Sequence, residues 1–166
     1  MISLKKVIKL IKIHMDRKDD IVFKDILSKD KIKIVENVSD WKEAVNLSVG
    51  LLEKDGIVPS DYKTKVIESV NELGPYIFIA PGIAMPHVQY FGETEVGISL
   101  LRINREVSYD NEKSADLFFA FSAKDSKSHI KMIQELASFL FDDKNIEALR
   151  SKKTTEEIYD YIQAYG

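Results

Sequence analysis

The chain has 166 residues, 45% of them hydrophobic, which suits about one domain with a core of its own. Its 24 Lys and Arg are balanced by 27 Asp and Glu, and the resulting net charge of −3 argues against a protein that mainly grips nucleic acid. The sequence contains no Cys, which excludes disulfide scaffolds, Cys-based zinc sites and thiol catalysis. No apolar run approaches the roughly 18 residues that a membrane span needs.

The first 22 residues predict an amphipathic helical extension. The helical spacing i, i+3, i+4, i+7 is carried by Leu4, Val7, Ile8 and Ile11. Lysines fill much of the other face and interrupt every apolar run, so the segment lacks the hydrophobic stretch of a signal peptide. We expect this helix to pack on the domain or on a second subunit; a helix lying on an anionic membrane surface is the alternative.

Two helices are predicted in the first half of the remaining chain. The first carries an apolar stripe between Trp41 and Leu52, with Ser39 as its N-cap and Gly56 as its stop. The second begins at Pro59-Ser60 and ends at Gly74-Pro75.

Short apolar segments then predict strands over Tyr76–Ala80, Val96–Ile103 and Asp116–Ala123, with Pro81-Gly82 ending the first. The polar residues 104–114 predict a loop or an edge excursion. Helical spacing returns from Ser126, and Thr154 with Glu157 has the spacing of a capping box for a last helix. This order predicts an α/β single-domain sandwich, a small mixed β-sheet flanked by helices, although periodicity does not determine the strand order.

His87 is the histidine that its surroundings restrict most. It follows Ala80-Pro81-Gly82-Ile83-Ala84-Met85-Pro86, in which two prolines and a glycine limit the backbone to few paths. A side chain on such a fixed turn is well placed to hold a reacting group. The alternative is a histidine that only satisfies a local hydrogen bond.

His129 lies at the start of the helix predicted from Ser126. A side chain in the first turn lies near unpaired backbone N–H groups and the positive end of the helix dipole, which suits an anion such as a phosphoryl group. Considered alone, His129 is better interpreted as an incidental surface residue. The third histidine, His14, is interpreted as a surface residue of the N-terminal segment.

Other chemistries find little support in the sequence. Ser126 and Ser128 flank His129, but neither lies on a nucleophile-elbow motif, so a Ser-His-Asp triad is not indicated. His87, His129 and a carboxylate would suffice for zinc in principle, yet no HxxxH or comparable spacing favours such a site. The sequence has no Gly-rich phosphate loop and no dinucleotide fingerprint. We therefore expect neither a metal nor a nucleotide cofactor.

Two separate segments resemble one protein family. The segment from Gly74-Pro75-Tyr76 to His87, with its Pro-Gly-Ile-Ala-Met-Pro-His motif, is similar to the active-site segment of IIA components of the bacterial phosphoenolpyruvate-dependent sugar phosphotransferase system. It resembles the mannitol/fructose class (type-2 IIA), within it the ascorbate- and galactitol-type branch, although Val88-Gln89 stands where a small residue often follows the histidine. Residues 128–136 look like the second histidine segment of that class.

The resemblance implies a phosphotransferase. In that family the first histidine accepts a phosphoryl group from the phosphocarrier protein HPr and passes it to a cysteine or histidine of a IIB partner. By resemblance, His87 is the phosphorylated nucleophile, His129 is the supporting histidine, and residues 23–166 form the phosphotransfer domain. The same resemblance implies a cytoplasmic protein, no metal in the transfer, and a membrane-bound IIC component on a separate chain.

An active site that docks two proteins should have an apolar rim. The candidates, each of which is equally interpretable as core, are Ile83, Met85, Val88, Tyr90 and Phe91. A regulatory IIA-like module, whose phosphorylation state controls a partner protein, is the second hypothesis for function. A protein that keeps the IIA fold without the activity is a third, and the sugar or sugar acid cannot be identified from the sequence.

Overall fold

A five-stranded mixed sheet lies at the centre of the computed structural model, which describes residues 3–6 and 22–165. Its strands are β1 (Ile32–Val35), β2 (Phe78–Ala80), β3 (Gly82–Ala84), β4 (Gly97–Ser108) and β5 (Ser114–Ser122). In the sheet order β1-β4-β5-β3-β2, the pairs β1–β4 and β5–β3 are parallel, and the pairs β4–β5 and β3–β2 are antiparallel. The predicted fold class, a small mixed sheet flanked by helices, is confirmed.

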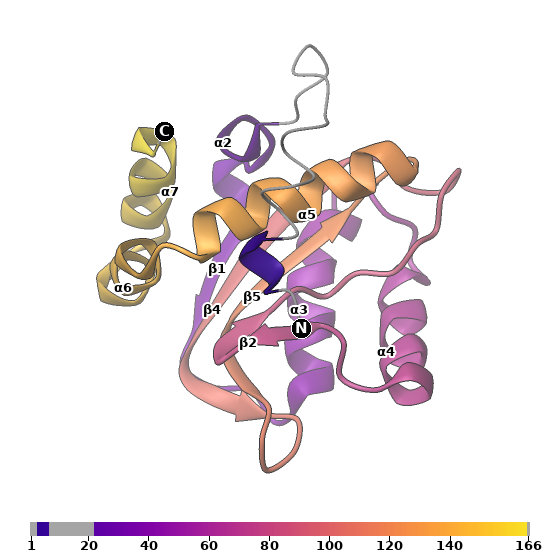
Figure 1. Ribbon diagram of the computed structural model, residues 1–166, viewed down its shortest axis with the longest axis horizontal. Coiled ribbons are helices and arrows are strands. Elements are labelled where there is room, and N and C mark those ends of the chain that lie inside the picture. The colour runs from indigo at the N-terminus through magenta and orange to yellow at the C-terminus, as the bar shows by residue number, and fades with distance from the viewer. Residues whose placement is uncertain (1–2, 7–21, 166) are drawn as a thin grey trace.

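Helices cover both faces of the sheet. They are α2 (Phe23–Ile26), the 3₁₀ turn η2 (Lys29–Lys31), α3 (Trp41–Glu53), α4 (Tyr62–Leu73), α5 (Ser126–Leu140), α6 (Asp143–Ser151) and α7 (Thr155–Ala164). Helices α3 and α4 pack on one face, and α5 crosses the other face together with α2, α6 and α7 (Figure 1). The two faces therefore bury two separate hydrophobic clusters.

Strand β5 supplies both clusters. Its side chains alternate between the two faces, as the pleat of a strand requires. Phe119 and Phe121 lie in the cluster beneath α5, whereas Phe118 and Ala120 lie in the cluster beneath α3 and α4. All four are fully buried, which explains why this strand reads as a continuous apolar run rather than as an alternating one.

Two helix starts differ from the sequence predictions: α4 begins at Tyr62 with Asp61 as its N-cap, not at Pro59-Ser60, and the N-cap of α3 also differs. Asp40, not Ser39, is the N-cap of α3, because its carboxylate accepts the N–H of Glu43. Ser39 instead donates its own N–H to the Glu43 carboxylate, 2.9 Å away. Helix α4 ends at Gly74, which has a φ of 95°. Thr154 caps α7 by accepting the N–H of Glu157, as its spacing predicted.

The strand predictions needed larger corrections. Strand β4 continues to Ser108, so residues 104–108 are not a loop, and only residues 109–113 connect it to β5. Pro81-Gly82 ends β2 as predicted, but the chain then continues directly into the antiparallel β3, which was not predicted. Strand β1 and helix α6 were not predicted, since β1 has only four residues and α6 is mostly polar.

The predicted N-terminal extension lies mostly outside the described residues. Of its apolar stripe only Leu4 is described, and it is 43% exposed. The neighbouring Lys5 places its Nζ 5.5 Å from the centre of the Phe141 ring, so this short segment contacts the end of α5. Val7, Ile8, Ile11, His14 and the charged residues 16–20 are not described. Within the described ranges, no helix combines the length and apolar character needed to cross a membrane.

We expect Gly82→Ala to destabilise the fold by about 2 kcal/mol or more. Gly82 has a φ of 83°, which an L side chain rarely adopts. An added Cβ would also overlap Nη2 of Arg150 and lie 3.2 Å from Oδ1 of Asp116. Arg150 is held there by two 2.8 Å bonds to the Asp116 carboxylate, so it cannot move without breaking that ion pair. Urea unfolding at neutral pH measures the loss.

Gly56→Ala is the matched control for this substitution. Gly56 has a comparable φ of 72°, but an added Cβ there meets no atom within 4 Å. It should cost only the backbone strain, on the order of 1 kcal/mol. Equal losses for the two variants would show that the Arg150–Asp116 pair does not restrict Gly82.

Candidate active site

The topology brings His87 and His129 together. His87 is the third residue after β3, and His129 lies in the first turn of α5, which follows β5. Strands β3 and β5 are parallel neighbours, so their carboxyl ends lie at the same edge of the sheet. Sites in α/β proteins form at such edges, where loops and helix starts converge. The two predicted site histidines therefore lie side by side, with ring centres 5.5 Å apart.

Phe121, at the end of β5, is the floor beneath both histidines. Its ring stacks on the His87 ring with centres 4.5 Å apart and an interplanar angle of 23°. The same phenylalanine lies 5.5 Å from the His129 ring. A third aromatic ring, Tyr76, meets His87 edge-on at 5.3 Å and 89°. These contacts leave the His87 ring partly exposed and hold it between two aromatic side chains.

The backbone fixes which nitrogen of His87 is free. Nδ1 lies 2.5 Å from the carbonyl oxygen of Met85. A carbonyl only accepts hydrogen bonds, so Nδ1 carries the proton of the neutral ring. The lone pair of the neutral imidazole is then on Nε2, and no hydrogen-bond partner among the described residues occupies that nitrogen. The geometry thus supplies a nucleophilic nitrogen that needs no prior deprotonation near neutral pH.

Burial keeps both rings uncharged near neutral pH. It lowers the pKa of His87 to about 4; the nearby His129 acts in the same direction, and the bond to the Met85 carbonyl opposes both. Burial also lowers the pKa of the half-buried His129. A neutral imidazole donates one hydrogen bond and attacks with its other nitrogen, which suits a pair that acts on one phosphoryl group.

The start of α5 is already capped by a carboxylate. Asp125 accepts the N–H of Ser128 at 2.8 Å, and the Ser128 hydroxyl bonds back to the N–H of Asp125 at 3.2 Å. An anion bound at this helix end would therefore face the Asp125 carboxylate. His129 lies one turn after Asp125, and its ring lies beside that of His87. Its place in the site therefore depends on His87 and not on a free helix terminus.

Only part of the expected apolar rim lies at the surface. Ile83 and Met85 are 5% and 2% exposed and belong to the core, so their assignment to the rim is wrong. Phe91 is 37% exposed, and its ring lies 6.0 Å from that of His129. Val88 and Tyr90 are partly buried. Ile130, next to His129, is 43% exposed and was not anticipated.

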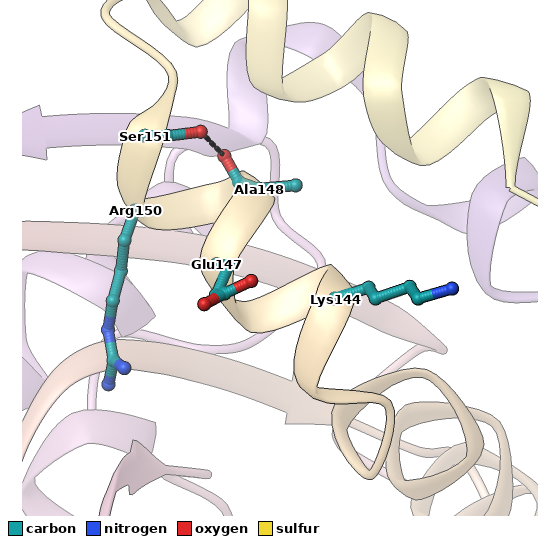
Figure 2. Close-up of a pocket in the computed structure, with 5 residues that line it drawn as sticks. All are labelled: Lys144, Glu147, Ala148, Arg150 and Ser151. Atoms are coloured by element: carbon teal, nitrogen blue, oxygen red, sulfur yellow. Dashed lines mark hydrogen bonds between the residues drawn. The ribbon is translucent and has the colours of Figure 1, made fainter.

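A hollow of about 660 Å³ lies elsewhere, along α6. Figure 2 shows its five lining residues on that one helix, with Lys144 and Arg150 extended in different directions. Arg150 is engaged with Asp116, and neither histidine lines the hollow. We therefore assign the candidate active site to the histidine pair and not to this hollow. In residues 3–6 and 22–165, no three His, Asp or Glu side chains gather as a metal site would require.

We expect acid to destabilise the wild type more than His87→Asn. The pKa of His87 falls from 6.5 to about 4 on folding, so between these pH values the unfolded chain binds more protons there than the folded one. Stability then drops as the pH falls through this window. The extra loss between pH 7 and pH 4.5 should be about 1 to 2 kcal/mol, because partial exposure of the ring reduces the full effect. Urea unfolding at both pH values measures it, and parallel losses in the two proteins would contradict the assignment.

A family model confirms the resemblance. Residues 25–165 match the model of the phosphoenolpyruvate-dependent sugar phosphotransferase system, EIIA 2. The chain belongs to this family. The ascorbate-specific EIIA component of Escherichia coli K12 is 31% identical over 144 residues, which cover 84% of this chain and 94% of that protein. The mannitol-specific cryptic IIA component of the same strain is 31% identical over 141 residues, 83% of this chain and 95% of that protein.

Solved structures of IIA proteins have the same fold. The solution structure of the mannitol-specific cryptic IIA from Escherichia coli superposes with a TM-score of 0.78 at 29% identity, covering 85% of this chain and 97% of that one. A complex of the Escherichia coli mannitol IIA with phosphorylated IIB has a TM-score of 0.73 at 20% identity, covering 83% and 97%. This chain is therefore a IIA-type phosphotransferase protein of the sugar phosphotransferase system.

Three residues at the site went unrecognised in the sequence. Tyr62, Tyr76 and Phe121 all contact His87 or the backbone beside it. Tyr76 stands within the Gly-Pro-Tyr segment that carries part of the resemblance, so a signal for it existed. Tyr62 and Phe121 read as ordinary apolar residues of a helix and a strand, and nothing in the sequence marks them.

Proposed function

We propose that this EIIA 2 protein accepts a phosphoryl group on Nε2 of His87 from phosphorylated HPr and passes it to a IIB component. The observation that carries the proposal is the hydrogen bond from Nδ1 of His87 to the Met85 carbonyl, with His129 alongside. This bond assigns the reactive lone pair to Nε2. The Nε2–P bond forms as the N–P bond of the donor phosphohistidine breaks, and the donor imidazole keeps the electron pair of that bond.

His129 supports the transfer in this proposal. Phosphoryl transfer depends on in-line positioning and on stabilising the charge of the phosphoryl oxygens. A ring centred 5.5 Å from the His87 ring is near enough to donate an N–H to a phosphoryl oxygen on His87 Nε2. The Nδ1–H bond to Met85 stabilises the positive charge that the His87 ring gains once Nε2 is substituted.

Exposed apolar side chains beside the histidines are suited to protein docking. Phe91 and Ile130 flank His129 and remain 37% and 43% exposed. Large exposed apolar residues next to a reactive group favour a protein partner. A protein of the same fold has been solved in complex with phosphorylated IIB, which supports IIB as one partner here. In this proposal the relay runs in the cytoplasm, and IIB passes the phosphoryl group to the sugar or sugar acid that a membrane IIC component takes up.

The test is a reconstituted relay. The protein is mixed with phosphoenolpyruvate, enzyme I and HPr, and the intact mass and the modified residue are determined. One acid-labile phosphate on His87 is expected. The phosphorylated protein is then offered to purified IIB proteins of the ascorbate and mannitol types, since the relatives carry those specificities.

The regulatory hypothesis predicts a different second step. Both hypotheses expect phosphorylation of His87, so the first step does not separate them. Rapid loss of phosphate to one IIB protein supports the transport relay. A stable phosphoprotein that transfers its phosphate to no IIB protein would favour the regulatory hypothesis over the transport relay. A protein that HPr does not label, while a known IIA in the same tube is labelled, would contradict both.

A further inference from the structure

The backbone that carries His87 lies outside the sheet. Residues 85–90 belong to no strand, so no β-ladder holds them. Their polar groups are nevertheless paired. The N–H of Met85 donates to Ile77, and the carbonyl of Pro86 accepts the N–H of Phe121. The next two residues, His87 and Val88, are bonded by side-chain hydroxyls instead of by backbone.

Tyr62 bonds the residue that follows His87. Its ring is fully buried at the first turn of α4. Its hydroxyl lies 2.7 Å from the carbonyl of Phe121 and 3.2 Å from both the N–H and the carbonyl of Val88. The single hydroxyl proton goes to the closer Phe121 carbonyl, and the oxygen accepts the N–H of Val88. One hydroxyl thus joins the end of β5 to the residue after His87.

Tyr76 bonds His87 itself. Its hydroxyl donates to the carbonyl oxygen of His87 at 2.5 Å. The same side chain places its ring edge-on to the imidazole, with centres 5.3 Å apart. Tyr76 therefore restrains both the main chain and the ring of His87. Tyr76 lies just before β2 and Tyr62 lies in α4, so the two restraints come from different elements.

We infer that Tyr62 and Tyr76 are positioning residues that hold His87 in the one orientation in which Nδ1 reaches the Met85 carbonyl and Nε2 faces the partner. The inference rests on the proposed function and names residues that act through His87 instead of touching the phosphoryl group. A short loop without ladder bonds is free to rotate its peptide planes unless side chains fix them. The two hydroxyls bond the carbonyl and the N–H of the same His87–Val88 peptide group, so loss of either removes one of its two restraints and allows this plane to shift. A displacement of that kind, even of about 1 Å, costs a reaction of this type up to about 100-fold.

The test uses Tyr76→Phe and Tyr62→Phe, with Tyr161→Phe as the matched control. Tyr161 also has a hydrogen-bonded hydroxyl, 2.6 Å from Oδ1 of Asn145, but it joins α7 to α6 far from the histidines in the chain and in the fold. Removing the Tyr161 hydroxyl measures how much stability and activity the protein loses when any such hydrogen bond is lost. Each variant is first compared with the wild type by circular dichroism and urea unfolding.

The first readout is the tautomer of His87 in the unphosphorylated protein. Nitrogen chemical shifts of the imidazole distinguish a proton on Nδ1 from one on Nε2. The wild type and Tyr161→Phe should show Nδ1–H almost exclusively. In Tyr76→Phe and Tyr62→Phe the shifts should move toward a mixture of the two tautomers. This readout does not depend on phosphoryl transfer, so it remains informative even if the proposed function fails.

The second readout separates rate from affinity. With phosphorylated HPr as the donor, the two site variants should lose about 10- to 100-fold in kcat, while KM changes less than about threefold. Tyr161→Phe should match the wild type in both. If the His87 shifts and kcat of Tyr76→Phe equal those of Tyr161→Phe, the positioning role is wrong. If Tyr62→Phe does not fold, Tyr76→Phe alone decides.

Discussion

His87→Asn should abolish phosphorylation of the protein by HPr. The side chain of asparagine can place an N–H near the Met85 carbonyl, where His87 has its Nδ1–H at 2.5 Å, so the local bond is largely replaced. Asparagine has no nitrogen lone pair that attacks phosphorus. We expect the rate to fall by about a thousandfold or more, which means no detectable label. His87→Ala should give the same loss and should also leave the Met85 carbonyl without its partner.

Incubation with phosphoenolpyruvate, enzyme I and HPr, followed by intact mass measurement, checks this result. The wild type serves as the positive control, and Tyr161→Phe controls for a change in overall stability. Both should carry one phosphate that is lost in acid. Stoichiometric labelling of His87→Asn would show that another residue is the acceptor. His129 would then be the first candidate, because its ring lies beside the same surface.

The sequence predicted the two histidines but not why they meet. Short apolar runs identified β2 and β5, but β3, the strand directly before His87, was not predicted, and the sequence contained no information on strand order. The site forms because β3 and β5 are parallel neighbours, which only the folded sheet reveals. Only the resemblance to the family predicted that the two histidines lie next to each other. Physical reasoning on His129 alone emphasised the helix terminus, which Asp125 in fact caps.

Fold prediction failed where short or polar segments depend on their neighbours. Strand β1 has four residues and exists because it pairs in parallel with β4. The second half of β4 carries Asn104 and Glu106, which read as loop residues, although pairing with β5 resumes at Val107 after a register shift. Helix α6 is mostly polar, since only Asn145, Ile146 and Leu149 are buried. In each case tertiary contacts override a weak local signal.

The same limit applies to the residues around His87. Tyr62 has helical spacing, and its apolar ring is part of the cluster beneath α3 and α4. Its hydroxyl acquires a role only because the chain after β3 passes over the start of α4. Ile83 and Met85 were equally ambiguous between rim and core. Ile83 is buried in β3 inside the sheet, and Met85, directly after this strand, is buried in the same cluster.

His129→Ala should still accept a phosphoryl group but should pass it on about 100-fold more slowly. The half-buried ring has a lowered pKa, so it is neutral near pH 7 and offers one N–H to the phosphoryl oxygens. Removing a single such donor from a preorganised site typically costs about 100- to 1,000-fold in rate. Acceptance survives because Nε2 of His87 and its bond to Met85 are untouched.

Single-turnover transfer from the phosphorylated protein to IIB measures this step apart from the labelling. The IIB concentration is varied to saturation, because the exposed Phe91 contacts the His129 ring at 6.0 Å and its displacement would weaken docking instead of chemistry. A slower rate at saturation, with an unchanged half-saturating concentration, indicates loss of charge stabilisation. Phe91→Ala is the matched comparison and should raise the half-saturating concentration with little change in the saturated rate. A transfer rate of His129→Ala equal to that of the wild type would reduce His129 to a packing residue against Phe121, and the Nδ1–H of His87 would then be the remaining donor that stabilises the phosphorylated ring.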